Sequence, residues 1–257
     1  MITSASNTRI KKVAALNQKA KERRQEGRYV VEGVKMFLEA PEEEIEEVYV
    51  SEGFHNPACD RKLNGLHAEQ VSEEVFRKMS DTSTPQGILC VMKRKQYTPD
   101  DLLQAANPLL MLLEDIQDPG NLGTILRTGE GAGIDGVIMS RDTADIYNPK
   151  TIRSTMGSIY RVPFLYVSSL SDMIAELKQK KITVYAAHLK GKQWYDQADY
   201  SGGSAFLIGN EGNGLSDSLS FGADVKIRIP MCGQVESLNA AMACGILAYE
   251  AYRQRRG

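Results

Sequence analysis

The sequence contains few of the residues that build metal centres or disulfide frameworks. Its 257 residues include only four cysteines and three histidines. The histidines are scattered, and the cysteines show no paired ligand spacing, so we expect no metal site. Unpaired thiols of this kind are typical of a reducing compartment, which predicts a cytoplasmic protein. The residues concerned are Cys59, Cys90, Cys232, Cys244, His55, His67 and His188.

Long apolar runs are also missing. No stretch approaches the roughly 20 apolar residues that span a bilayer. The basic N-terminus is not followed by the apolar stretch of a secretory signal, so we expect no membrane association. There is no low-complexity tract and no repeat of solenoid period. A chain of 257 residues is long enough for one large or two ordinary domains.

The formal net charge is only -2, but the charges are unevenly distributed. Residues 9–28 contain eight basic side chains and two acidic ones, and residues 39–47 contain six glutamates. The basic segment has two interpretations, a solvated helix face or a local site for an anionic partner. Its basic residues are Arg9, Lys11, Lys12, Lys19, Lys21, Arg23, Arg24 and Arg28.

The first part of the chain alternates short helical and strand patterns. Such alternation predicts a small α/β domain over residues 1–95. Residues 96–107 break the pattern and are interpreted as a linker, in which Thr98 and Asp101 have the spacing of a capping box. The expected helices are 6–26, 33–40 and 72–79, and the expected strands are 28–31, 48–51 and 87–92.

Residues 108–257 predict a second α/β domain. Its strand candidates are uninterrupted apolar runs, which are typical of a parallel sheet buried on both faces. Helical patterns lie between them, so we expect a mostly parallel sheet with helices on both faces. The expected strands are 109–113, 136–140, 162–167, 182–187, 205–208 and 225–229, and the expected helices are 122–130, 149–156, 169–180 and 237–253.

A glycine-rich run at residues 129–133 superficially resembles a dinucleotide-binding loop. Such a loop must lie between a strand and the start of the next helix. Here the glycines follow a helical pattern and precede a strand, so we interpret them as the C-terminal cap of that helix.

Three other polar stretches follow strand candidates and precede helix candidates or turns. They cover residues 118–127, 209–214 and 229–239. Open α/β sheets bind ligands beyond the carboxyl ends of their strands, so folding is expected to bring these stretches together around one pocket. Arg127 offers a guanidinium suited to phosphate, and the glycines at 209–214 allow close approach of backbone to a ligand. Ser237 is expected to cap the last helix, with Asn239 in its first turn.

Together these stretches resemble the three motifs of the SpoU (TrmH-type) RNA ribose methyltransferases of the SPOUT superfamily. The resemblance rests on Asp118-x-Gly120-Asn121-Leu122-Gly123 with Arg127, on Gly209-x-Glu211-Gly212-x-Gly214, and on Ile229-Pro230-Met231 with Ser237-Leu238-Asn239. It implies an α/β fold with a C-terminal trefoil knot, S-adenosylmethionine as cofactor, a homodimer and an RNA substrate. Residues 1–95 are similar, more weakly, to a ribosomal-protein-like RNA-binding domain, which favours ribosomal RNA.

The resemblance also implies a site. The cofactor would be held by backbone around Gly209, Ile229 and Leu238, with Asn210 and Met231 lining its pocket. Arg127 would activate the ribose 2′-hydroxyl. Because a guanidinium normally stays protonated, phosphate binding and stabilisation of developing negative charge are the physically simpler role for Arg127. The residues that would orient the reactants are Asn121, Glu211, Ser237 and Asn239.

Other functions fit the same sequence. The chain could be a non-catalytic RNA-binding protein on this fold, it could methylate a base rather than a ribose, or its substrate could be transfer RNA. The small residues Ala240, Ala241 and Ala243 in the last helix fit either close dimer packing or the core of the domain.

Overall fold

The computed structural model describes residues 1–256, which form two compact units. The first unit contains residues 1–95 together with residues 145–160, and the second unit contains residues 96–144 and those from 161 onward. The segment 145–160 therefore packs with the N-terminal part of the chain, although the sequence places it between two strands of the second unit. No helix within residues 1–256 is long and apolar enough to cross a membrane.

The first unit is a four-stranded mixed sheet in the order β1-β4-β2-β3. Strand β4 pairs antiparallel with β1 and β2, and β2 pairs parallel with β3. Apolar side chains of α1 and α5 form one core cluster with those of the strands. The strands are β1 (Arg28–Glu32), β2 (Ile45–Ser51), β3 (Ala68–Val71) and β4 (Ile88–Lys93), and the helices are α1 (Thr8–Gln18), α2 (Ala20–Glu26), α3 (Val34–Glu39), α4 (Pro57–Leu63) and α5 (Glu73–Met79).

The single helix expected over residues 6–26 is in fact two helices. The chain bends at Lys19, whose backbone is extended with φ -126° and ψ 114°. Arg23 explains the bend. Its buried guanidinium donates hydrogen bonds to the carbonyl oxygens of Leu16 and Asn17 at the end of α1 and forms an ion pair of 2.7 Å with Asp145. A distant carboxylate thus helps to fix a break that the local sequence does not signal.

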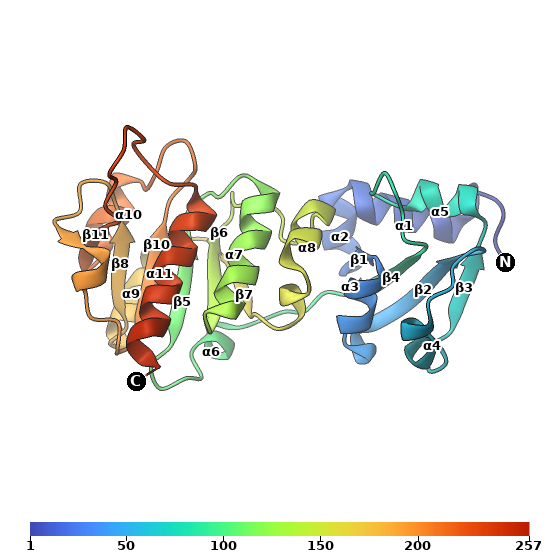
Figure 1. Ribbon diagram of the computed structural model, residues 1–257, viewed down its shortest axis with the longest axis horizontal. Coiled ribbons are helices and arrows are strands. Elements are labelled where there is room, and N and C mark those ends of the chain that lie inside the picture. Colours follow the sequence, from blue (N-terminus) through green and yellow to red (C-terminus); the bar gives the residue numbers. More distant parts are fainter. Residues whose placement is uncertain (257) are drawn as a thin grey trace. The chain divides into compact units, whose positions relative to one another are not determined.

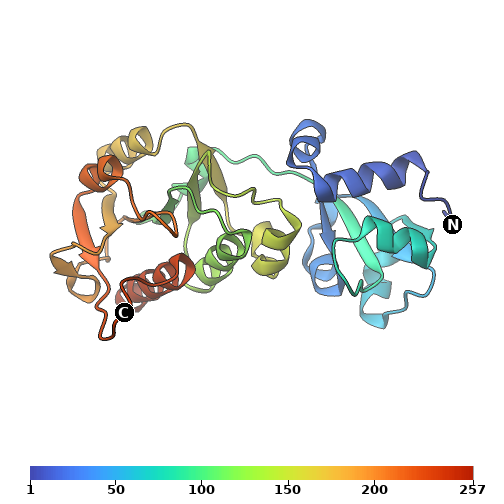
Figure 2. The same cartoon turned by 90° about the horizontal axis from the view of Figure 1, so that it is seen from above.

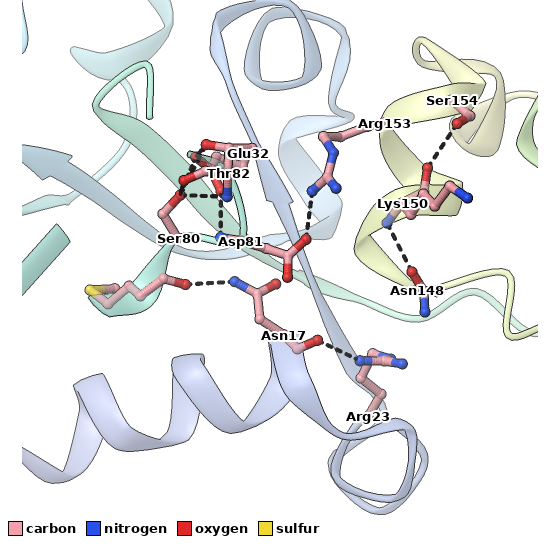
Figure 3. A network of polar contacts seen from close by, with 11 residues as sticks. Asn17, Arg23, Glu32, Ser80, Asp81, Thr82, Asn148, Lys150, Arg153 and Ser154 are labelled. Atoms are coloured by element: carbon pink, nitrogen blue, oxygen red, sulfur yellow. Dashed lines mark hydrogen bonds and ion pairs between the residues drawn. The ribbon is translucent and has the colours of Figure 1, made fainter. Parts of the chain in front are cut away.

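The segment 145–160 is tied to the first unit at several points. It contains helix α8 (Pro149–Thr155), capped by Asn148, and a 3-10 turn (Ser158–Tyr160). Arg153 of α8 forms an ion pair of 2.8 Å with Asp81, which Figure 3 shows beside the hydrogen bonds of Asn17 and Arg23. The Tyr160 hydroxyl donates to the carbonyl oxygen of Met36 at 3.0 Å. The first unit is therefore complete only with this segment in place.

The second unit is built on a seven-stranded sheet in the order β7-β6-β5-β10-β8-β11-β9. All neighbouring strands are parallel. Helices α7 and α11 lie on one side and α9 and α10 on the other (Figures 1 and 2), which confirms the expected parallel sheet covered on both faces. The strands are β5 (Leu109–Leu113), β6 (Gly136–Ser140), β7 (Phe164–Val167), β8 (Thr183–Ala187), β9 (Gln193–Trp194), β10 (Ser204–Ile208) and β11 (Val225–Arg228), and the helices are α6 (Pro99–Leu102), α7 (Pro119–Gly131), α9 (Leu170–Gln179), α10 (Asp217–Gly222) and α11 (Ala240–Arg255).

Several local predictions for this unit are confirmed. Helix α7 ends at Gly131 and Gly133 has φ +75°, so the glycine run is a helix terminus and not a phosphate loop. Thr98 and Asp101 form the expected capping box, and Ser169 caps α9.

The strand order reverses direction between β5 and β10. Strands β6 and β7 extend the sheet on one side of β5, whereas β10 lies on its other side. Ile208 at the end of β10 is paired with Leu113 at the end of β5, so the two strands end side by side. Such a reversal opens a crevice at the carboxyl ends of the strands, where α/β proteins bind ligands.

Candidate active site

A chain of three polar side chains joins the segments that follow β5 and β10 to the start of α11. The Asn121 side-chain amide donates to Glu211 Oε1 at 2.9 Å, and Asn121 Oδ1 accepts from the Asn239 amide at 2.9 Å. Asn121 lies in the first turn of α7, which is fixed because Asp118 accepts a hydrogen bond from its backbone N–H. The structure therefore brings together three of the predicted site residues from segments about 90 and 118 residues apart in the chain.

Glu211 is held at the start of α7 by several donors. Its carboxylate accepts hydrogen bonds from the backbone N–H groups of Gln117 at 3.0 Å and Asp118 at 3.2 Å, in addition to Asn121. Partial burial alone would raise the pKa of Glu211, but the hydrogen bonds outweigh it and hold that pKa below its ordinary value. The carboxylate is therefore ionised at neutral pH, next to the positive end of a helix dipole.

The loop after β10 is shaped by Asn210 and Gly209. The Asn210 amide donates to the carbonyl oxygen of Asp115 at 2.7 Å, and its Oδ1 accepts from the backbone N–H groups of Gly212 and Asn213. Gly209 passes so close to the returning chain that a Cβ there would lie 2.2 Å from the carbonyl carbon of Gly214. Only glycine fits at position 209, so the loop depends on it.

The cap of α11 is Asn239 and not Ser237, which corrects the sequence-based expectation. Asn239 Oδ1 accepts from the backbone N–H groups of Ala241 at 2.9 Å and Met242 at 3.3 Å. Because the helix begins at Ala240, three residues beyond Ser237, the Ser237 hydroxyl does not cap it. Capping also orients the Asn239 amide toward Asn121, so one side chain both starts the helix and completes the polar chain.

A cavity of about 290 Å³ opens beside this chain, near the lower limit of the range common for small-molecule sites. It lies at the carboxyl ends of the strands, where the loops that precede α10 and α11 emerge above the sheet in Figure 1. Its lining includes all five residues predicted to bind a cofactor, together with Glu211 and Ser237. Those five residues are Gly209, Asn210, Ile229, Met231 and Leu238.

Two features of the lining leave polar groups available to a ligand. Among the described residues, none of the backbone N–H groups of 229–238 donates to another part of the chain. Arg228 Nε is buried and has no hydrogen-bond partner in the part of the chain that the structure covers. Apolar side chains, including Ile208, Ile227 and Leu247, supply the remaining walls. A ligand with a flat apolar body and polar edges fits such a lining.

Arg127 lies apart from these contacts. It is exposed on α7, it does not line the cavity, and within residues 1–256 its guanidinium makes no hydrogen bond or ion pair. The structure thus joins Asn121, Glu211 and Asn239 without Arg127, and the activating role of Arg127 stays a prediction. A guanidinium with no protein partner is free to meet an anionic substrate.

The sequence reasoning missed two parts of the cavity wall. One is the segment Ala187–Leu189, which follows β8 and could have been found because β8 pairs with β10, whose carboxyl end also lines the cavity. The other is the face of α11 that bears Ala240, Ala243 and Leu247, where small side chains make room for the cavity. Among the described residues no group of His, Cys, Asp or Glu side chains is arranged to hold a metal ion.

A parallel sheet whose carboxyl-end loops enclose a partly apolar cavity defines an α/β protein that binds an organic cofactor or nucleotide. Comparison with known families identifies which one. Residues 108–249 match the model of the SpoU rRNA Methylase family, and residues 7–90 match the model of an MRM3-like substrate binding domain. The chain belongs to the SpoU rRNA methylase family.

Individual relatives are similar over nearly the whole chain. The 23S rRNA (guanosine(2553)-2′-O)-methyltransferase RlmP of Bacillus subtilis is 35% identical over 250 residues, which cover 96% of this chain and 97% of that protein. The AdoMet complex of AviRb from Streptomyces viridochromogenes has a TM-score of 0.88 at 25% identity, covering 96% of this chain and 98% of that one. An AdoMet-bound rRNA methyltransferase from Sinorhizobium meliloti has a TM-score of 0.84 at 29% identity, covering 98% of this chain and 97% of that one.

Proposed function

We propose that this protein is an S-adenosylmethionine-dependent methyltransferase that acts on a ribose 2′-hydroxyl of ribosomal RNA, with a guanosine of 23S rRNA as the first substrate to test. The observation that carries the proposal is the chain Glu211–Asn121–Asn239, which joins the first family motif to the two motifs that line the cavity. The relative RlmP is named for transfer to a guanosine of 23S rRNA, and it matches both units of this chain.

The cofactor would be held by groups that the fold leaves available. The unpaired backbone N–H groups of residues 229–238 would bind its polar edges, and the apolar wall at Ile208, Ile227 and Leu247 would pack against its flat ring system. Gly209 and Asn210 would close the other side. When bound, S-adenosylmethionine supplies an electrophilic methyl group for transfer.

The chain's own residues would position the RNA sugar and balance charge. Arg127, which has no partner among the described residues, would bind a substrate phosphate and stabilise negative charge that develops on the ribose oxygen. Glu211 and Asn239 would keep Asn121 in one orientation at the start of α7. Holding the reactants in line in this way is worth roughly 7–11 kcal/mol in favourable cases.

The test combines transfer of labelled methyl to 23S rRNA with digestion of the product to nucleosides. The label should be found in a 2′-O-methylated nucleoside; label in a methylated base would reject ribose chemistry. Arg127→Ala should lower the transfer rate by about a hundredfold or more, while calorimetry shows cofactor affinity within about twofold of wild type. Arg141→Ala, an exposed arginine of the same unit, is the control. If Arg127→Ala lowered cofactor affinity as much as the rate of methyl transfer, the role of Arg127 in binding the substrate phosphate and stabilising charge would be rejected.

Three further properties belong to the proposal. We propose that the first unit selects the RNA, which agrees with its match to a substrate binding domain. We also propose a homodimer formed through α11, and a cytoplasmic location, where ribosomal RNA is modified. The trefoil knot implied by the family resemblance is proposed on that basis alone.

A further inference from the structure

A surface of the second unit beside the cofactor cavity combines cations with aromatic rings. It lies on the edge strand β9 and its neighbour β11, on the loop after β8 and at the end of α10. We call it the cation–aromatic surface and define it as Lys190, Lys192, Trp194, Phe221, Lys226 and Arg228. None of the three family motifs includes these residues.

Two cations lie over two rings on this surface. Lys226 and Arg228 are separated by one residue on β11, so their side chains project from the same face of the sheet. Lys226 Nζ lies 4.2 Å from the centroid of the Phe221 ring, and the guanidinium carbon of Arg228 lies 3.8 Å from the Trp194 ring. The second contact is fixed by strand pairing, because Arg228 and Trp194 are register partners of β11 and β9.

Phe221 is unusually exposed for a large apolar side chain. It shows 76% of its surface, although its helix neighbours Leu219 and Ser220 are buried. With Lys190, Lys192 and Lys226 it lines a surface hollow of about 560 Å³. An exposed ring beside a hollow presents a flat face that a second ring system could stack against.

The charges of the hollow favour an anionic ligand. Lys190, Lys192 and Lys226 form no ion pair with any described residue. The two carboxylates in the lining are Asp217 and Asp224, and Asp224 is paired with Lys178 at 2.8 Å. Phosphates bound by lysine with bases stacked on exposed rings are the means by which proteins hold single-stranded nucleic acid.

The hollow also adjoins the cofactor cavity. His188 lines both, and Arg228 of the cation–aromatic surface lines the cavity. We propose that the cation–aromatic surface binds an unpaired stretch of the substrate RNA, stacking a base on Phe221 and leading the strand toward the cofactor cavity. This inference rests on the proposed function, because it assumes that RNA is the substrate.

The protein carries its own probe for this binding. Trp194 is the single tryptophan of the chain and lies under Arg228. Titration of the full-length protein with a short oligouridine, in saturating S-adenosylmethionine, should quench Trp194 fluorescence and give an affinity at each salt concentration. Absence of quenching together with absence of binding by anisotropy would overturn the proposal.

Substitutions separate the charge and stacking contributions. Lys190→Gln/Lys192→Gln/Lys226→Gln should weaken oligouridine binding about tenfold or more and reduce the slope of log K against log salt by about 2. The control Lys180→Gln/Lys181→Gln removes lysines from the opposite, amino-terminal end of β8 and should change neither. Phe221→Leu should weaken binding about fivefold or more, whereas Phe221→Tyr should retain it.

Each outcome decides one question. Unchanged affinity and salt slope in the lysine variant would overturn the proposed surface, and a change in molar mass by light scattering would mark it as a protein interface instead. If wild type methylates RNA while these variants bind oligouridine normally, this inference fails and the proposed function stands. If wild type binds oligouridine here but transfers no methyl to RNA, the proposed function fails. Thermal melting curves matching wild type confirm that each variant is folded.

Discussion

At the scale of single residues, charged side chains at fixed places have separate tasks. Arg23 is buried, and its guanidinium is hydrogen-bonded to Asp145 and to two carbonyl oxygens, so it fixes the bend between α1 and α2. Glu211 is tied to the start of α7 and shapes the candidate site. Arg127 has no partner among the described residues, so it is available to a substrate. The sequence alone shows these three residues only as charged side chains. Their roles differ because each one contacts different groups in the folded chain.

Glu211→Gln should destabilise the protein in a pH-dependent way. The folded state lowers the pKa of Glu211, so its stabilising contribution is present above the unfolded value of about 4.3 and is lost as pH falls through the lower folded value. Because the residue is largely exposed, solvent screening limits the loss at pH 7 to about 1 kcal/mol. Urea denaturation at a series of pH values measures it.

The matched control is Glu236→Gln, which removes the same charge from the same cavity. Glu236 has no hydrogen-bond partner within residues 1–256, so its substitution should leave stability unchanged at every pH. The explanation by hydrogen bonding to the carboxylate would be contradicted in either of two cases. In one, Glu211→Gln lowers the free energy of unfolding as much at pH 3 as at pH 7; in the other, Glu236→Gln lowers it equally.

At the scale of elements, the sequence predicts the long apolar strands and helices. It misses elements too short to show a pattern and breaks that depend on residues distant in the chain. The uninterrupted apolar run Leu109–Leu113 predicts β5, and the structure confirms it as a strand in which every residue is buried. Strand β9 has only two residues and α10 has six, too few to show a period. The break at Lys19 depends on Asp145, more than a hundred residues away, and no local pattern carries that information.

The candidate site follows the same division. Polar residues after strands predicted a pocket at the strand ends, and the structure joins Asn121, Glu211 and Asn239 there. Whether Ser237 or Asn239 caps α11 could not be predicted, because both residue types cap helices well. Asn239 is the cap in the folded chain and is also hydrogen-bonded to Asn121, a contact visible only in three dimensions.

A glycine substitution tests whether the loop after β10 shapes the cavity. Gly209→Ala would place a methyl group 2.2 Å from the Gly214 carbonyl carbon, so the loop must move and cofactor affinity should fall about tenfold or more. Gly212→Ala, in the same loop, meets only the Asn210 side-chain oxygen at 3.4 Å and should bind normally. Calorimetry with S-adenosylmethionine distinguishes them; equal affinities would show that the loop does not shape the site.

At the scale of the whole molecule, the basic N-terminal segment divides into two sets. Arg9, Arg23 and Arg28 are committed to ion pairs with carboxylates of the first unit. The others are exposed and have no ion-pair partner among the described residues; they are Lys11, Lys12, Lys19, Lys21 and Arg24. The ion pairs therefore take the first set out of both interpretations, because these cations are neutralised within the protein. The second set is solvent-exposed, its role in binding an anionic partner stays a prediction, and it is the set to test against RNA.

Deleting residues 1–95 would be a poor test, because it would uncover the side of 145–160 that packs in the first unit. Lys11→Gln/Lys12→Gln in the full chain avoids this. It should weaken binding to a 23S rRNA transcript and lower the salt slope by about 1.5, with cofactor affinity unchanged. Lys180→Gln/Lys181→Gln removes equal charge from the second unit as a control. An unchanged salt slope in the first variant would exclude these lysines from RNA binding.

The last helix carries an apolar stripe that a homodimer would cover. Met242, Tyr249 and Tyr252 are 56%, 48% and 41% exposed, and their spacing places them on one face of α11. Large apolar side chains gathered on one helix face of a folded protein mark an interaction surface. The small residues Ala240, Ala241 and Ala243 do not form this stripe, since the first two are buried and Ala243 lines the cavity.

We expect light scattering to give the wild-type protein twice the mass of one chain. Met242→Lys/Tyr249→Lys should halve that mass, because the two ammonium groups that each chain would bury in the dimer interface would repel one another and lose their hydration. Leu38→Lys, which alters an exposed leucine of α3, should leave the mass unchanged. The Met242→Lys/Tyr249→Lys variant should keep the thermal transition of a folded chain, because neither side chain is buried within a single chain. A wild-type protein with the mass of one chain at micromolar concentration would reject the dimer, whatever the variants do.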